Sequence, residues 1–173
     1  MLYLNAEAAY CKRFFPKNHY SSDRMEENKL MKLVVIDGQG GRMGKTIIEQ
    51  LKKNCPDDLP FQIYALGTNS TATQAMIKGG ADFGATGENP VIVNVQNADI
   101  IVGPIGIVIA NSLLGEITPA IAAAVGSSPA YKILIPVNRC NHRIVGCQEA
   151  PLSEYLNQVC QEVLERLKES GHS

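Results

Sequence analysis

Apolar residues along this chain follow two patterns that alternate from residue 31 onward. Short, mainly apolar segments, which predict strands, lie at residues 32–36, 61–66, 81–85, 100–102 and 131–137. Apolar residues at helical spacing predict helices at residues 43–54, 71–78, 90–97, 105–114, 119–126 and 152–167. Strands that alternate with helices predict a mainly parallel sheet with helices on both faces. We therefore expect a three-layer, doubly wound α/β domain of the Rossmann-like type.

Three segments carry mixed signals. Asn89-Pro90 is a favourable helix start, whereas the β-branched residues after it favour a strand; we expect a helix at residues 90–97. Residues 105–114 are apolar on most faces, so we expect a helix that is either central to the core or in contact with another subunit. After a polar turn at residues 138–142, residues 143–147 are predicted to return as an edge strand.

The domain organisation follows from a change in pattern near residue 30. Residues 1–30 mix both signs of charge with aromatics and have no clean period, so we expect an N-terminal extension that is partly disordered or a short helix. Met25 and Met31 also allow a later start of the native protein. Residues 31–173 are predicted to form a single Rossmann-like domain, which the chain length of 173 residues permits.

Charge and cysteine content narrow the class of partner and the compartment. The formal net charge is -1, which gives no electrostatic reason to expect nucleic acid or a membrane surface as a partner. The 5 cysteines form no framework spacing and no signal peptide precedes them, so we expect a reduced, cytoplasmic protein. The most apolar segment, residues 98–114, is interrupted by Asp99 and is shorter than the roughly 20 residues of a membrane span.

A glycine cluster directly after the first predicted strand is the strongest functional signal. It reads as strand, tight turn and helix, an arrangement in which backbone N–H groups at a helix N-terminus can hold a phosphate. Its spacing, G-x-x-G-x-x-G, is shifted by one residue from the dinucleotide pattern, and Gln39 stands where a P-loop would need glycine. The candidate cofactor-binding residues of this turn are Gly38, Gln39, Gly40, Gly41, Arg42 and Met43. The alternatives are an aberrant P-loop and a purely structural turn.

Further candidates follow the other predicted strands, because ligands of doubly wound sheets bind beyond the carboxyl ends of the strands. They are Thr68 and Asn69 after the second strand, Thr86 after the third, and Gly103 after the fourth. Thr68 and Asn69 stand where an acidic residue would bind the ribose of NAD, and either NAD or NADP is the expected cofactor. The alternative is that these loops are polar simply because loops face water.

The sequence gives little support for metal binding or for catalysis. Asp37 either holds Mg²⁺ together with Glu88 or, as we favour, anchors the turn by accepting hydrogen bonds from backbone amides. Cys140, His142 and Cys147 match no common zinc spacing, so no metal is expected. No arrangement of serine, cysteine and histidine indicates nucleophilic catalysis, and the catalytic residues, if any, are left unassigned.

Two family resemblances extend this interpretation. The turn at residues 38–44 is similar to the cofactor loop of dihydrodipicolinate reductases, which bind NADH or NADPH, although their paired-histidine motif and substrate domain have no counterpart here. Residues 31–165 resemble the uncharacterised bacterial family labelled domain of unknown function 3842. That resemblance rests on the segments V-I-D-G-Q-G-G (35–41), A-L-G-T-N (65–69), G-A-T-G-E-N (84–89), I-I-V-G-P-I (100–105) and N-R-C-N (138–141). It implies a small Rossmann-like cytoplasmic protein without an assigned activity.

Three hypotheses of function follow. The first is an uncharacterised nucleotide-binding protein, a sensor or accessory protein for NAD(H) or NADP(H). The second is a small oxidoreductase whose active site is completed by oligomerisation, using Glu88 or Arg139. The third is a structural or interaction protein without a ligand, which self-associates through the segment at residues 105–114.

Overall fold

The strands form one parallel sheet. The computed structural model describes residues 30–55, 61–137, 144–147 and 150–170. Within these residues five strands pair in the order β3-β2-β1-β4-β5, every pair parallel. Their bounds are β1 (Met31–Asp37), β2 (Phe61–Gly67), β3 (Phe83–Thr86), β4 (Ile100–Pro104) and β5 (Tyr131–Ile135). The predicted parallel sheet is confirmed.

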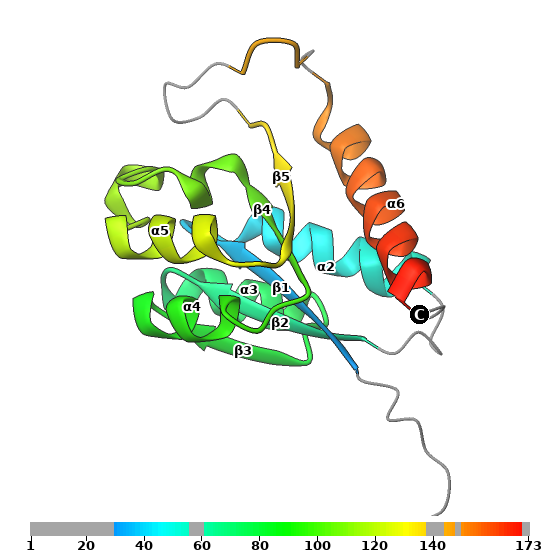
Figure 1. Ribbon diagram of the computed structural model, residues 1–173, viewed down its shortest axis with the longest axis horizontal. Helices are drawn as coiled ribbons and strands as arrows, with labels where there is room; N and C mark the ends of the chain where they lie inside the picture. Colours follow the sequence, from blue (N-terminus) through cyan, green and yellow to red (C-terminus); the bar gives the residue numbers. More distant parts are fainter. Residues whose placement is uncertain (1–29, 56–60, 138–143, 148–149, 171–173) are drawn as a thin grey trace, which may run out of the picture.

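Helices cover both faces of this sheet, because residues of the central strands alternate between two cores. Leu33 and Val35 of β1 pack with α2 and α6, and Met76 of α3 joins the same core. Val34 and Ile36 point to the other face and pack with α4 and α5. Figure 1 shows α4 and α5 on one side of the sheet and α2 and α6 on the other. The helices are α2 (Arg42–Asn54), α3 (Ser70–Lys78), α4 (Glu88–Val95), α5 (Pro119–Ser127) and α6 (Leu152–Ser170). This is the three-layer, doubly wound architecture that the sequence predicts.

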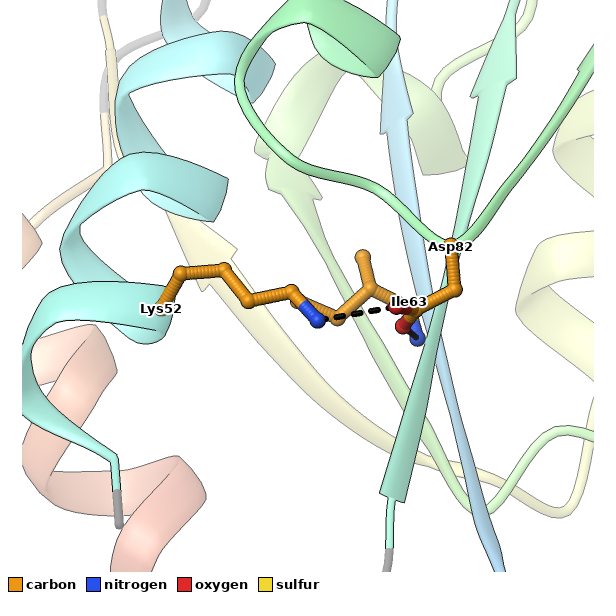
Figure 2. Close-up of polar contacts among 3 residues, drawn as sticks. All are labelled: Lys52, Ile63 and Asp82. Carbon is orange, nitrogen blue, oxygen red and sulfur yellow. Dashed lines mark hydrogen bonds and ion pairs between the residues drawn. The ribbon is translucent and has the colours of Figure 1, made fainter. Parts of the chain in front are cut away.

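Two aspartates tie neighbouring strands together at the amino ends of β3 and β4. Asp82, just before β3, accepts a hydrogen bond from the Ile63 N–H of β2 at 2.7 Å, and its other oxygen lies 2.9 Å from Nζ of Lys52. Figure 2 shows this arrangement, in which Lys52 reaches from α2 to the edge of the sheet. Asp99, just before β4, likewise accepts from the Lys32 N–H of β1 at 2.7 Å. Both carboxylates bind strand N–H groups at the edge opposite the glycine turn.

The prediction of a single helix at residues 105–114 is wrong. The structure has two short 3-10 helices there, η1 (Ile105–Val108) and η2 (Leu113–Gly115). Asn111, Leu113 and Leu114 have positive φ angles of 63°, 52° and 60°, which interrupt a helix. The hydroxyl of Ser112 donates to the Gly106 carbonyl at 2.5 Å, and such side-chain bonds compete with the helical ladder. Burial makes this segment apolar without making it helical.

Of the other two segments with mixed signals, one prediction is confirmed and one is wrong. The helix expected at residues 90–97 is present as α4, and it begins earlier than expected, at Glu88. Residues 144–147 form a turn and not the predicted edge strand. Residues 1–29, the whole polar turn at 138–142, and Arg143 lie outside the described residues. None of the described helices has both the length and the apolar character that crossing a membrane demands.

Candidate functional site

A cleft lies where the strand order of the sheet reverses. The chain runs from β1 outward through β2 to β3 and then returns to β4, on the other side of β1. Connections leave β1 and β4 in opposite directions at their carboxyl ends, and this opens a crevice between them. The crevice has a volume of about 400 Å³. Its position is the one at which doubly wound sheets bind their ligands.

The two walls of the cleft differ in chemistry. The glycine turn and the first helical turn after it supply backbone amides, the Arg42 side chain and the Thr46 hydroxyl. The facing wall is mainly apolar and consists of Pro104, Ile105, Gly106, Ile109, Leu113, Val137 and Leu152. A cleft of this kind suits a ligand that has a polar or anionic end and a flat apolar body.

The shape of the turn depends on Gly41. This residue is the N-cap of α2 and has a φ angle of 64°, in the left-handed region that side chains with a Cβ disfavour. A Cβ at this position would lie 2.5 Å from the Cα atom of Ala72 in α3. The close contact between the turn and α3 therefore needs a glycine here, independently of any ligand.

Asp37 anchors the turn from below. Its side chain is only 6% exposed and accepts hydrogen bonds from the N–H groups of Gly38 at 2.8 Å and Gly44 at 2.7 Å, with Met43 as a further donor. Burial raises the pKa of the Asp37 carboxyl, more than these bonds lower it, and the charge of Glu116 raises it slightly further. The favoured interpretation of Asp37 as an anchor of the turn is confirmed.

Few amides of the turn are left for a ligand. Gly38, Met43 and Gly44 donate to Asp37, while the Gly41 N–H donates to the Gly38 carbonyl at 2.9 Å. The N–H groups of Gly40 and Arg42 have no acceptor among the described residues. Together with the exposed Arg42 guanidinium they are the donors that remain at the N-terminus of α2.

Glu116 is the residue that the sequence analysis missed. It follows η2, and its Oε2 atom accepts hydrogen bonds from the Gln39 N–H at 2.8 Å, from Nδ2 of Asn69 at 3.1 Å and from the Thr68 hydroxyl. Burial alone would raise the pKa of the Glu116 carboxyl, but the three hydrogen bonds together outweigh burial and lower it. No motif surrounds Glu116, and 77 positions separate it from Gln39, so only the fold brings the two together.

The structure brings some of the predicted site residues together and separates others. Residues 38–43 all line the cleft. Thr68 and Asn69 lie beside the turn but contact Glu116, and the Asn69 side chain also caps α3 by accepting from the Ala72 N–H at 2.9 Å. Neither residue is part of the cleft lining.

Thr86 and Gly103 are likewise not among the residues that line the cleft. The Thr86 hydroxyl is 2.6 Å from the Thr73 hydroxyl of α3. Gly103 is buried in β4, where a Cβ would approach the Ile36 carbonyl oxygen of β1 to 2.6 Å. Gly103 therefore allows the close packing of two strands.

The metal alternatives gain no support from the geometry. The Glu88 carboxylate accepts a hydrogen bond from the Thr118 hydroxyl, while Asp37 is engaged with backbone amides. Among the residues that the structure describes, no group of three histidine, cysteine or acidic side chains is placed to bind a metal ion. Arg139, Cys140 and His142 lie outside that part of the chain.

These observations define a three-layer α/β protein with a cleft at the switch point of its parallel sheet. The chain belongs to the family described as domain of unknown function (DUF3842), whose profile matches residues 32–168. Comparison with curated proteins gives no significant match.

One similar solved structure is a dodecameric FMN-dependent UbiX-like decarboxylase from Escherichia coli O157:H7. It shares 15% sequence identity over 80% of this chain and 95% of that chain, with a TM-score of 0.37. FMN dependence and a dodecameric assembly are stated for that enzyme.

Proposed function

We propose that this protein binds a nucleotide-type small molecule in the cleft between β1 and β4. In this proposal the phosphate rests on the N–H groups of Gly40 and Arg42, which have no acceptor in the described part of the chain, and on the Arg42 guanidinium. The flat ring packs against the apolar wall, which includes Pro104, Ile105 and Leu113. The observation that carries the proposal is that one cleft at the switch point combines these two amides, a nearby cation and an apolar wall.

The cleft favours a ligand with a single phosphate-bearing end. Its volume of about 400 Å³ is near the lower end of the roughly 300–1,000 Å³ of small-molecule sites. A dinucleotide would also need room beside the end of β2, where Glu116 covers Thr68 and Asn69. We therefore propose a mononucleotide such as AMP or FMN ahead of the NAD or NADP that the sequence pattern favours.

The role proposed is binding, as in a cytoplasmic sensor or accessory protein, and not a catalytic step. The two carboxylates nearest the cleft, Asp37 and Glu116, are both engaged by hydrogen bonds from the turn. Neither is free to act as a general base in the observed arrangement.

Isothermal titration and thermal unfolding of the full chain with AMP, FMN, NAD and NADP test this proposal. A ligand at 100 times its Kd should stabilise the protein by about 2.7 kcal/mol. Arg42→Ala should weaken binding of the phosphorylated ligand about tenfold, because it removes a charge-assisted contact. Lys53→Ala is the matched control, since it removes a cation from the far end of the same helix.

The results separate the hypotheses. Binding that Arg42→Ala weakens and Lys53→Ala leaves unchanged supports the cleft as the phosphate site. Absence of binding by all four ligands would contradict the proposed function. Native mass spectrometry of the same samples counts subunits, which tests the predicted self-association.

A further inference from the structure

Three hydrogen-bond donors from separate parts of the chain converge on one oxygen atom of Glu116. The Gln39 N–H comes from the turn after β1, and the Thr68 hydroxyl and the Asn69 amide come from the end of β2. All three donate to Oε2. Convergence of several donors on one negatively charged oxygen is the way in which proteins bind phosphate and carboxylate groups.

This anion position is distinct from the cleft. A Cβ added to Gly38 would lie 2.6 Å from Oε2 of Glu116 and 2.8 Å from the Thr68 hydroxyl, so the carboxylate rests directly on Gly38. Glu116, Thr68 and Asn69 lie on the β2 side of the turn, whereas the cleft opens toward β4. The turn thus separates an open position at Gly40 and Arg42 from a second position that the chain's own carboxylate fills.

We propose that Glu116 determines ligand selectivity by occupying this second anion position. The inference rests on the proposed function, because selectivity presupposes a ligand in the cleft. A ligand with one phosphate binds in the cleft without disturbing Glu116. A ligand with a second phosphate that reaches Thr68 and Asn69 meets a negative charge that already holds their donors, and it is rejected.

A purely structural role of Glu116 makes a different prediction. A carboxylate that only joins the β1 turn to the η2 segment would, when removed, lower stability and weaken all ligands alike. If the Glu116 carboxylate occupies an anion position, its removal should leave that position open to an added anion. Selectivity between ligands, and not affinity alone, therefore distinguishes the two roles.

Glu116→Ala and Glu116→Gln test the proposal, with Glu88→Ala as the matched control. Glu88 also accepts a hydrogen bond from a threonine, Thr118, but it accepts none from Gln39, Thr68 or Asn69, whose donors converge on Glu116. Glu116→Gln keeps the size and an acceptor oxygen while it removes the charge, so it remains informative if Glu116→Ala folds poorly. Circular dichroism and thermal unfolding establish that each variant is folded.

The ligands are AMP, adenosine 2′,5′-bisphosphate, NADP and inorganic phosphate. In the wild-type protein AMP should bind more tightly than the bisphosphate. Glu116→Ala should raise the affinity for the bisphosphate and NADP about tenfold and change that for AMP less than about threefold. Inorganic phosphate should stabilise Glu116→Ala more than the wild type or Glu88→Ala.

Each result supports or overturns a defined statement. AMP binding with unchanged selectivity in both Glu116 variants overturns the role of Glu116 and leaves the proposed function standing. Weaker NADP binding by Glu116→Ala also overturns it, since it would mean that Glu116 contacts the ligand favourably. If no nucleotide binds to any protein, the proposed function fails, and inorganic phosphate alone then decides whether Glu116 fills an anion position.

Discussion

The backbone N–H of Gly44 donates a hydrogen bond at 2.7 Å to the buried carboxylate of Asp37, seven residues earlier in the chain. One side chain thereby joins the last residue of β1 to the first turn of α2. The carboxylate also supplies a negative charge near the positive end of the helix dipole. The protein therefore partly neutralises the positive end of α2 with a side chain of its own.

Substitution of Asp37 by asparagine should reveal a stability that falls as pH rises. The pKa of Asp37 is raised by burial, so between its unfolded and folded values the native state binds more protons than the unfolded state. The wild-type contribution is fully present below the unfolded pKa and is lost as pH rises through the folded pKa. The free energy of unfolding of wild type minus that of Asp37→Asn should thus decrease with pH, as urea titrations across the acidic range would measure.

Glu116→Gln provides the opposite control for that experiment. The lowered pKa of Glu116 means that its contribution is present above the unfolded pKa and is lost as pH falls through the folded one. The free energy of unfolding of wild type minus that of Glu116→Gln should therefore increase with pH. If both differences change in the same direction, the assignment of charge at the turn is wrong.

Substitution of Gly41 by alanine should destabilise the protein by at least about 2 kcal/mol. The left-handed backbone costs an alanine roughly 1–2 kcal/mol, and the contact with the Ala72 backbone adds to this. Gly126→Ala in α5 is the control, because its Cβ would meet no atom within 4 Å and helical alanine is favoured over glycine. Chemical denaturation should show loss of stability in the first variant and none in the second.

Asp82→Ala should cost more stability than Lys52→Ala, although the two residues form an ion pair. The pair is partly exposed at both ends, and such pairs contribute about 1 kcal/mol or less. Removal of Asp82 also leaves the Ile63 N–H without its acceptor, a loss of about 1–3 kcal/mol. Equal losses in the two variants would show that the ion pair, and not the strand N–H, carries the effect.

The described cysteines should differ in reactivity. Burial raises the pKa of the Cys55 thiol to about 11 and also raises that of Cys160, whereas Cys147 is exposed. Because the thiolate is the reactive form, iodoacetamide near pH 8 should label Cys147 long before the other two. Peptide mass spectrometry at successive times measures the order. Rapid labelling of Cys55 in the folded protein would mean that the ends of α2 and α6 open readily.

The sequence predicts most of the fold because strands that are buried on both faces of a parallel sheet appear as continuous apolar runs. The apolar run at residues 33–36 has no alternation, since Leu33 and Val34 face different cores. The same signal misleads at residues 105–114, where burial is compatible with either a helix or two short 3-10 helices. There the deciding factors are the positive φ of Asn111 and the Ser112 bond to Gly106, which no periodicity reports.

The candidate site is predictable only as far as it is local. Asp37 lies next to the amides that it binds, so its role follows from the turn itself. Thr68 and Asn69 lie beside the turn, because parallel strands end at the same edge, but they do not line the cleft. Their partner Glu116 is a tertiary contact and has no sequence signature.

Asp82 and Asp99, at the edge of the sheet away from the cleft, also fix the alignment of the strands. A slip of β1 by one residue would still bury apolar side chains on both faces, so the hydrophobic pattern alone specifies register weakly. The bonds from Lys32 to Asp99 and from Ile63 to Asp82 would be lost in any slipped pairing. Two bonds at the edge away from the cleft therefore secure the alignment of the strands, independently of the contacts that shape the glycine turn.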